Sequence, residues 1–284
     1  MCVASVRFFY PDVCVRLLGG GHLQRGLADE LRRYWDVSVA DLPERDYGWG
    51  FVKLEPLFRP VAERFLVLDS DTIIAGPVLQ LAARRDEDFI VDDEDQRPDA
   101  VKSIYFDTTK ARQEGKPLND PAFLFNTGQW FGKTGVVCRN DFDGLVDWAF
   151  PRRLRRPSVF KNGEQGILNY VLNEQWRSGK ARIARIPLMR WPPYGMQQLD
   201  AHAISMKASP PLVVHWAGIK KVRQRDMVGA DVLAFFENEY YKRLPAGTSR
   251  RILAGSQYVL SAWSHRAHSR ARLAFQRLTN TEAR

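Results

Sequence analysis

The chain of 284 residues carries a net charge of +9 at pH 7, with the hydrophobic (45%) and charged (26%) content of an ordinary globular protein. No apolar run reaches the roughly 18 residues that span a bilayer, and no basic-then-apolar signal pattern opens the sequence. Three scattered cysteines, Cys2, Cys14 and Cys138, make neither a disulfide framework nor a zinc motif. We therefore expect a cytoplasmic protein whose positive charge meets an anionic partner: nucleic acid, acidic lipid or a phosphate-bearing substrate.

The first part of the chain alternates between two kinds of apolar spacing. Helical spacing is predicted over residues 4–10, 22–34 and 49–58, and strands over 13–18, 37–40 and 64–68. This alternation indicates an α/β fold with a mostly parallel central sheet flanked by helices. In sheets of this kind, ligands gather at the carboxyl ends of the strands.

The second part is less regular. We predict a short helix after residue 77, an edge strand over 88–95 and a mobile loop over 96–119. We then predict a strand over 122–131, helices over 140–150 and 163–172, and strands over 181–189 and 212–217.

The composition changes from about residue 246 onward. Arginines then alternate with aromatic and aliphatic residues, against a single acid, Glu282. This pattern fits a helix lying on an anionic membrane surface, and the alternative is a solvated helix that packs one face on the domain. We expect two parts, a globular domain over residues 1–245 and a basic amphipathic tail over residues 246–284.

Two carboxylates follow the apolar run Phe65-Leu66-Val67-Leu68, at Asp69 and Asp71. Carboxylates at the end of a buried strand are costly without a partner, and hard divalent cations prefer oxygen ligands. The alternative is an Asp-rich turn without further function. A late strand ends in His215, and two carboxylates with one imidazole suit Mn²⁺ or a similar divalent ion.

A pair of lysines, Lys220 and Lys221, follows His215 within a few residues, and lysines suit a diphosphate as point charges. A metal ion that bridges a diphosphate is a Lewis acid, which stabilises the charge of a leaving group. The chemistry implied is the departure of a nucleoside diphosphate from a sugar.

Four motifs in order along the chain resemble those of GT-A glycosyltransferases, in particular the retaining family 8 type, which includes bacterial lipopolysaccharide galactosyl- and glucosyltransferases and glycogenin. The motifs are Phe65-Leu66-Val67-Leu68-Asp69-Ser70-Asp71, Phe125-Asn126-Thr127-Gly128, Glu164-Gln165-Gly166-Ile167-Leu168-Asn169 and His215-Trp216-Ala217-Gly218-Ile219-Lys220-Lys221. Each motif alone is weak, and the ordered set, over roughly residues 1 to 240, is more specific.

The resemblance implies a GT-A fold and a donor site made from these motifs. Asp69, Asp71 and His215 are expected to hold Mn²⁺ or Mg²⁺. The expected contacts to the nucleotide-sugar donor come from Asp69, Asn126, Gly128, Gly218 and Lys221. Gln165 is expected to support the anomeric carbon electrostatically, and Glu164 to hydrogen-bond sugar hydroxyls.

The activity that the resemblance implies is transfer of a hexose from a nucleotide sugar, a UDP-hexose, to an acceptor hydroxyl with retention of configuration. The expected acceptor is a glycan or glycolipid, as in lipopolysaccharide biosynthesis, reached at the inner membrane face through the tail. No nucleic-acid partner is expected.

Two departures from the family pattern stand out. The family begins with a uridine-binding strand ahead of the helix predicted over residues 4–10, so we expect this fold to lack part of its first strand. The family's donor-contacting Arg before Lys53-Leu54 is replaced by Phe51. Lys53 is either a basic contact to the donor or, as we favour, a solvated helix residue.

Three other readings stay open. Asp69 and Asp71 also fit the nucleophile and general acid of a haloacid-dehalogenase-like phosphatase, which needs a later acidic pair at another strand end. A nucleic-acid-binding protein accounts for the basic tail and leaves the aspartates unexplained. A degenerate transferase fold would bind a nucleotide without turnover.

Overall fold

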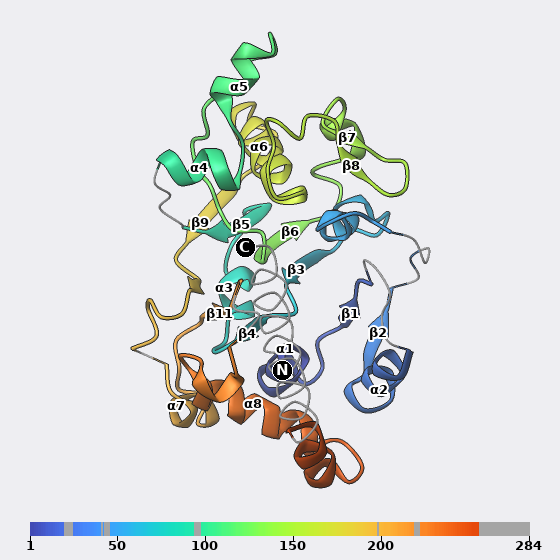
Figure 1. Cartoon of the computed structure of the whole chain (residues 1–284), viewed down its shortest axis with the longest axis vertical. Helices are drawn as coiled ribbons and strands as arrows, with labels where there is room; N and C mark the ends of the chain where they lie inside the picture. Colours follow the sequence, from blue (N-terminus) through green and yellow to red (C-terminus); the bar gives the residue numbers. More distant parts are fainter. Residues whose placement is uncertain are drawn as a thin grey trace, which may run out of the picture. The chain divides into compact units, whose positions relative to one another are not determined.

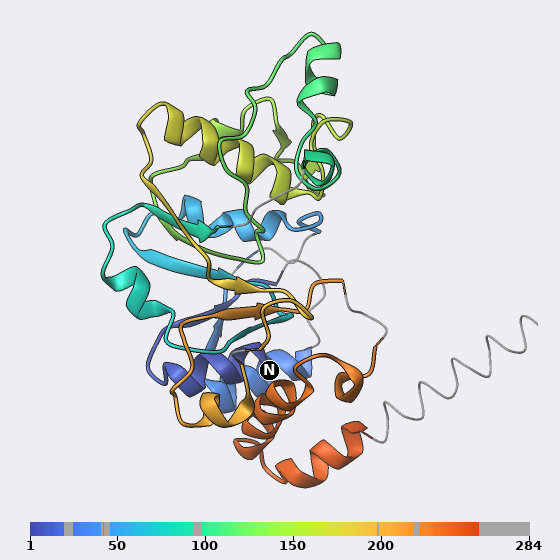
Figure 2. The same ribbon diagram turned by 90° about the vertical axis from the view of Figure 1, so that its left-hand side faces the viewer.

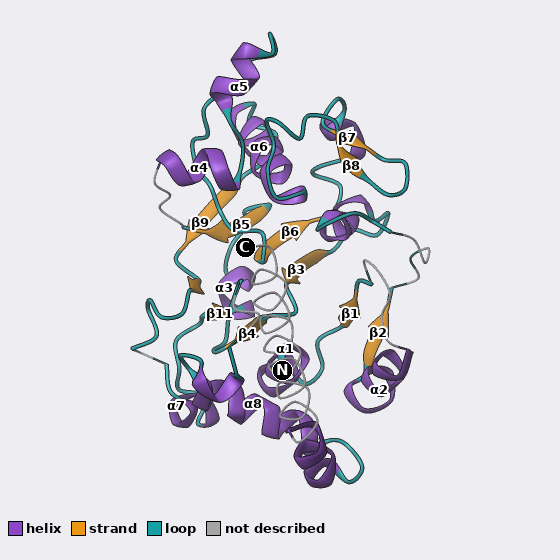
Figure 3. Ribbon diagram, viewed as in Figure 1, coloured by secondary structure: helices purple, strands orange, loops and turns teal. Residues whose placement is uncertain are grey.

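The computed structural model describes residues 1–19, 25–40, 42, 46–93, 98–197, 199–218 and 222–255. Within these ranges the chain is α/β (Figures 1 and 3). The α-helices are α1 (Cys2–Phe9), α2 (Arg25–Trp35), α3 (Leu79–Ala83), α4 (Pro98–Ile104), α5 (Thr108–Gln113), α6 (Glu164–Arg177), α7 (Ala201–Ser205) and α8 (Ala230–Lys242). The 3₁₀ helices are η1 (Phe51–Phe58), η2 (Arg139–Phe142) and η3 (Gln224–Asp226).

The strands are short and pair in both directions. They are β1 (Val15–Leu17), β2 (Val37–Val39), β3 (Arg64–Leu68), β4 (Thr72–Ile74), β5 (Phe89–Asp92), β6 (Gln129–Lys133), β7 (Val146–Asp147), β8 (Arg153–Leu154), β9 (Ile183–Ile186), β10 (Met189–Arg190) and β11 (Val213–His215). The main sheet has the order β3-β6-β5-β9, and a second sheet has the order β10-β11-β4.

The α/β class is confirmed, and the sheets are mixed rather than mostly parallel. In the main sheet, β6 is antiparallel to both β3 and β5, and only β5 and β9 run parallel. In the second sheet β10 and β11 are parallel and β4 is antiparallel. The strand predicted over 88–95 is confirmed as β5, but its predicted place at the edge of the sheet is wrong, because β5 lies between β6 and β9 with its four residues buried.

Both faces of the main sheet are buried, because successive side chains of a strand point to opposite faces. Phe89 and Val91 of β5 join a cluster that includes η1 and α6, whereas Ile90 joins a cluster that includes α1 and α3. Figure 2 shows α6 on one side of the main sheet and α1 on the other. The sheet is thus the middle layer of three, and near-continuous apolar strands such as Phe65-Leu66-Val67-Leu68 are what such a layer requires.

The chain leaves the main sheet where β3 ends and enters the second sheet after three intervening residues. The Asp69 main-chain N–H donates to the Gly128 carbonyl at 2.8 Å, and the Thr72 hydroxyl donates to the Asp69 carbonyl at 2.6 Å. These bonds fix a tight turn over residues 69–71 before β4 begins at Thr72. The two aspartates therefore lie where the two sheets part.

Two predictions between residues 96 and 150 are wrong. The expected mobile loop contains α4 and α5, and the Asp107 side chain caps α5 by accepting from the Lys110 N–H at 3.0 Å. The expected helix over 140–150 is instead the short η2 followed by strand β7.

The chain divides into two compact units, Met1–Phe236 and a second that begins at Glu237. Residues 256–284 lie outside the described ranges, so the membrane-surface tail stays a prediction. Among the residues that are described, no helix is long and apolar enough to cross a membrane.

Candidate functional site

The side chains of Asp69, Asp71 and His215 come together where β3 and β11 end. In the pairing of β4 with β11, His215 stands opposite Thr72, and the Trp216 N–H donates to the Asp71 carbonyl at 3.1 Å. One ligand atom from each of the three lies within 4.8 Å of the others. The His215 Nε2 atom is 3.1 Å from an Asp71 carboxylate oxygen and 4.0 Å from one of Asp69.

The His215 ring is held in place from two directions. Its side chain is only 4% exposed, and the Trp191 ring lies 4.8 Å away, centroid to centroid. On another side is Gly128, where an added Cβ would be 2.3 Å from the Cε1 atom of His215. A side chain at position 128 would therefore displace the imidazole.

The three side chains suit a divalent cation. The hydrogen bond with His215 lowers the pKa of Asp71 below its ordinary value of 3.8, so this carboxylate is ionised at neutral pH. The Asp69 and Asp71 side chains are 30% and 47% exposed, which leaves their oxygens accessible. Two carboxylate oxygens and one imidazole nitrogen form a donor set of the kind that divalent transition metals accept.

Lys53 of η1 joins this group to a second set of polar residues. Its ammonium lies 3.1 Å from the Asp69 carboxylate and 2.6 Å from the Glu164 carboxylate, and its side chain is 17% exposed. Burial alone lowers the pKa of Lys53, but the two carboxylates outweigh it and the pKa is raised. The prediction of a solvated helix residue is wrong, because η1 turns Lys53 toward the strand ends.

Glu164, the first residue of α6, is buried with 3% of its side chain exposed. Its carboxylate accepts from the Thr127 hydroxyl at 2.9 Å as well as from Lys53. Burial raises the pKa of Glu164, and the neighbouring Lys53 opposes this rise. Gly50 leaves room for the carboxylate, since a Cβ there would be 1.5 Å from its Oε2 atom.

Gln165 contacts the segment that precedes β6. Its Oε1 atom accepts from the Asn126 side-chain amide at 3.1 Å, and the Asn126 Oδ1 atom accepts from the Gly128 N–H at 2.7 Å. Asn126, Gly128, Glu164 and Gln165 are thus brought together, and Lys53 and Gly128 connect them to the three candidate metal ligands.

Two further side chains of α6, Asn169 and Asn173, bind the main chain of the same segment. Asn169 accepts from the Phe125 N–H and donates to the Phe125 carbonyl, both at 2.9 Å. Asn173 donates to the Phe123 carbonyl at 2.9 Å. The strand predicted over 122–131 therefore begins only at Gln129, because amide side chains replace a neighbouring strand over residues 122–126.

Two predicted contacts to the donor, Gly218 and Lys221, remain. Gly218 follows β11 by three residues, with a φ of 75° and open space where a side chain would be. Lys221 lies outside the described residues. The residues that sequence reasoning missed are Thr127, Gly50 and the buried role of Lys53. The recurring glycines of Gly48-Trp49-Gly50 were the available signal for a special turn.

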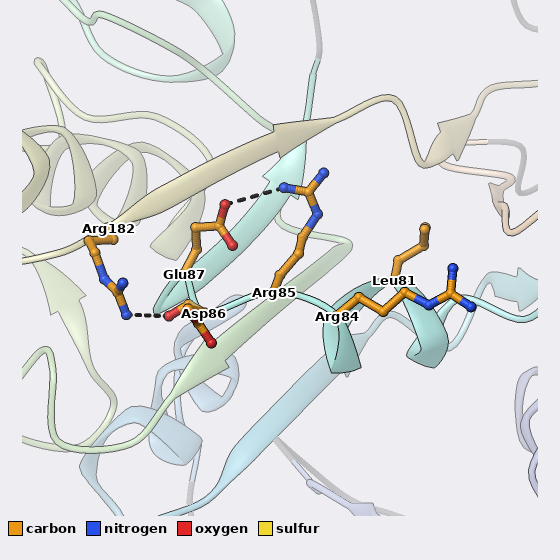
Figure 4. Close-up of a pocket in the computed structure, with 6 residues that line it drawn as sticks. All are labelled: Leu81, Arg84, Arg85, Asp86, Glu87 and Arg182. Atoms are coloured by element: carbon orange, nitrogen blue, oxygen red, sulfur yellow. Dashed lines mark hydrogen bonds and ion pairs between the residues drawn. The ribbon is translucent and has the colours of Figure 1, made fainter.

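A separate depression of about 550 Å³ lies at the opposite end of β3 (Figure 4). There, Arg64 at the start of β3 donates to the Arg85 carbonyl at 2.8 Å, and Arg85 pairs with Glu87 at 3.2 Å. Arg182 donates to the Asp86 carbonyl. Arg85 and Glu87 of this surface thus pair with each other, and Asp69 lies at the other end of the strand.

No protein-family model matches the sequence, and no curated protein matches it. The chemistry of the site has therefore to be inferred from its own geometry.

Proposed function

We propose that this chain is a metal-dependent glycosyltransferase of the GT-A type, similar to retaining family 8, that transfers a hexose from a nucleotide sugar to a glycan or glycolipid. One observation carries the proposal: a candidate metal group, Asp69, Asp71 and His215, lies next to a buried carboxylate and amide, Glu164 and Gln165, with Lys53 between them. A nucleotide sugar needs both parts, a cation for its diphosphate and polar groups for its hexose.

The proposed roles follow from how these residues are placed. Asp69, Asp71 and His215 hold Mn²⁺ or Mg²⁺, which supplies Lewis-acid stabilisation of the departing diphosphate. Asn126 and Gln165, which are fixed to each other by their amide hydrogen bond, line the hexose. A side-chain amide is a poor nucleophile, so Gln165 positions and stabilises rather than attacks.

The proposed reaction exchanges one bond of the anomeric carbon for another. The acceptor oxygen forms a bond to that carbon, and the bond from the carbon to the diphosphate oxygen breaks. The acceptor attacks on the same face as the departing diphosphate, so the configuration is retained. Its proton passes to the departing phosphate, so no protein base is needed. Glu164 already accepts from Lys53 and Thr127, which favours a positioning role for it over proton transfer.

The phosphatase alternative has less support from the described residues. It requires an acidic pair on a later strand, and the acidic cluster that begins at Asp92 of β5 comes too soon after Asp71 in the chain. Asp92 is 4% exposed and accepts from the Met189 N–H at 2.7 Å, a structural contact that ties β5 to β10. Trapping of an aspartyl-phosphate would nevertheless reverse this preference.

The first experiment is calorimetric titration of the protein with UDP, in the presence and absence of Mn²⁺, with GDP as the control nucleotide. Binding of UDP only with Mn²⁺ supports the proposal, and a panel of UDP-hexoses then follows, with the anomeric configuration of the product read by NMR. Absence of Mn²⁺-dependent nucleotide binding would contradict it.

The metal assignment is tested by Asp71→Asn. We expect Mn²⁺-dependent turnover of the donor to fall by at least about 100-fold, because a neutral amide replaces a charged ligand. The fold should remain, since the Asp71 side chain is half exposed. The matched control is Asp29→Asn on the surface of α2, where the side chain is 74% exposed. Turnover that survives Asp71→Asn would show that the metal lies elsewhere.

A further inference from the structure

A large aromatic side chain is exposed beside this site. Trp49 is 71% exposed, and its indole makes no hydrogen bond or ring contact with another described residue. Single exposed apolar residues are common on protein surfaces and need no explanation by themselves. Trp49 differs from these because the turn that carries it is fixed on both sides.

On the N-terminal side of Trp49, the turn is fixed by Tyr47 and Gly48. Tyr47 is 1% exposed, and its ring lies under the Arg152 guanidinium at 4.6 Å, with Phe150 packed edge-on at 5.1 Å. Gly48 then adopts a φ of 72°, and a Cβ there would be 2.3 Å from the Arg152 carbonyl oxygen. The main chain entering Trp49 is therefore pressed against buried structure.

On the other side of Trp49, the turn is fixed by the start of α6, which carries the candidate sugar-binding residues. Gly50 has a φ of 78° and lies directly against the Glu164 carboxylate. Gly163, one residue before α6, faces Trp49: a Cβ there would be 2.1 Å from the Trp49 carbonyl oxygen and 3.5 Å from the indole Cε3 atom. The indole thus stands at the N-terminus of α6, one residue along the chain from the glycine that packs on Glu164.

A water-exposed indole carried by a fixed turn has the properties of a stacking surface. Its faces are apolar, and covering them removes large apolar area from water, whereas a pyranose has one face of C–H groups and a rim of hydroxyls. Because the main chain of the turn is fixed before a ligand arrives, little main-chain conformational entropy is lost on binding. In the proposed function the start of α6 serves the donor sugar through Gln165, which leaves the outer surface for the second substrate.

Resting on that proposed function, we propose that Trp49 is the acceptor platform: its indole stacks on the C–H face of the sugar ring that offers the attacking hydroxyl. The acceptor is therefore a saccharide at its reacting end, and any lipid is attached further away.

The test begins with wild-type protein on an array of immobilised glycans in the presence of UDP and Mn²⁺. A glycan that binds is then used free in solution to compare wild type, Trp49→Ala, Trp49→Phe and the control Trp176→Ala, which removes a 45% exposed tryptophan near the other end of α6. The measurements are the acceptor KM, the kcat, hydrolysis of the donor without acceptor, and the shift of tryptophan fluorescence when the glycan binds.

We expect Trp49→Ala to raise the acceptor KM by roughly 5- to 10-fold, with Trp49→Phe closer to wild type. Donor hydrolysis and UDP binding should stay unchanged, and the fluorescence shift should disappear in both Trp49 variants and persist in Trp176→Ala. An unchanged acceptor KM in Trp49→Ala, or binding of no glycan by wild type that still binds UDP with Mn²⁺, would overturn the platform and leave the proposed function standing. Loss of Mn²⁺-dependent UDP binding in the wild type would instead refute the proposed function itself.

Discussion

The Lys53 ammonium balances the charge of two neighbouring carboxylates. Glu164 is buried almost completely, and an unpaired carboxylate in that position would be strongly disfavoured. The ammonium of Lys53, 2.6 Å away, provides the countercharge and also contacts Asp69. The same lysine therefore links the carboxylate at the start of α6 to a candidate metal ligand at the end of β3.

Replacement of this lysine tests that role, since Lys53→Met leaves the Glu164 carboxylate without its cation. We expect the free energy of unfolding to fall by about 3 kcal/mol at neutral pH, the scale for breaking a mostly buried ion pair. Adding Glu164→Gln in the same chain should recover most of the loss, whereas the exposed control Lys180→Met should change little. Urea unfolding measures all of these variants.

The same variant should respond to pH in a defined direction. The pKa of Glu164 is raised above its ordinary value of 4.5 by burial. At pH values between the unfolded and the folded pKa, the folded state therefore holds a proton that the unfolded state releases. Stability from this group is present at low pH and is lost as pH rises through the raised pKa. Without Lys53 the pKa rises further, so the deficit of Lys53→Met should be smaller near pH 5 than near pH 8. A deficit independent of pH would show that Glu164 is not responsible.

Helix α6 illustrates a structural role that apolar spacing does not reveal. Its existence was predicted from residues 163–172, and the structure confirms it as Glu164–Arg177. Its two asparagines, Asn169 and Asn173, look like polar interruptions of a buried face in the sequence. They are fully buried because they satisfy the main chain of residues 122–125, which has no strand partner there.

Removal of one of these amides tests the interpretation. Asn169→Ala leaves the N–H and the carbonyl of Phe125 buried without partners, so we expect a loss of about 2–4 kcal/mol in the free energy of unfolding. The control is Asn140→Ala, an exposed asparagine of η2, which should stay within about 0.5 kcal/mol of wild type. Equal effects of the two substitutions in urea titrations would argue against the interpretation.

What the sequence could predict differs between long and short elements. The runs that form β3, β11 and α6 have apolar patterns strong enough to be recognised, and they place Asp69, His215 and Glu164 correctly at strand or helix ends. The short helices α4 and α5 depend on local starts, a proline at Pro98 and the Asp107 cap, within a polar stretch that resembles a loop. Contacts such as that of Lys53 with Glu164 join residues far apart in sequence and leave no local pattern.

At the scale of the whole chain, positive charge is concentrated at one end. Residues 246–284 contain seven arginines and one glutamate, which accounts for +6 of the net charge of +9. Of this stretch, residues 247–255 are described and helical, with Ile252 and Leu253 exposed. Basic and apolar side chains in one segment are what an anionic lipid surface attracts.

Deletion of residues 250–284 tests this proposal for the membrane. We expect binding to vesicles that contain anionic lipid to be lost, because the deletion removes all seven arginines, and binding of UDP with Mn²⁺ to be retained. Neutral vesicles serve as the lipid control, and a full-length chain with Arg266, Arg270, Arg272 and Arg277 changed to glutamine as the matched charge control. Vesicle sedimentation at low and high salt gives the measurement. Undiminished sedimentation of the truncated chain would assign the membrane contact to another surface or to none.

The 144 residues that separate Asp71 from His215 have a consequence for assembly. Closing a chain segment of this length costs about 4–5 kcal/mol of entropy, and until the loop closes the ligand set does not exist. A cation bound to all three side chains would act as a cross-link that only the native state offers, so its binding free energy would add to the stability of the fold. Removal of the ion by a chelator would then favour unfolding, as heating does. The melting temperature would therefore rise with the fraction of protein that holds the ion.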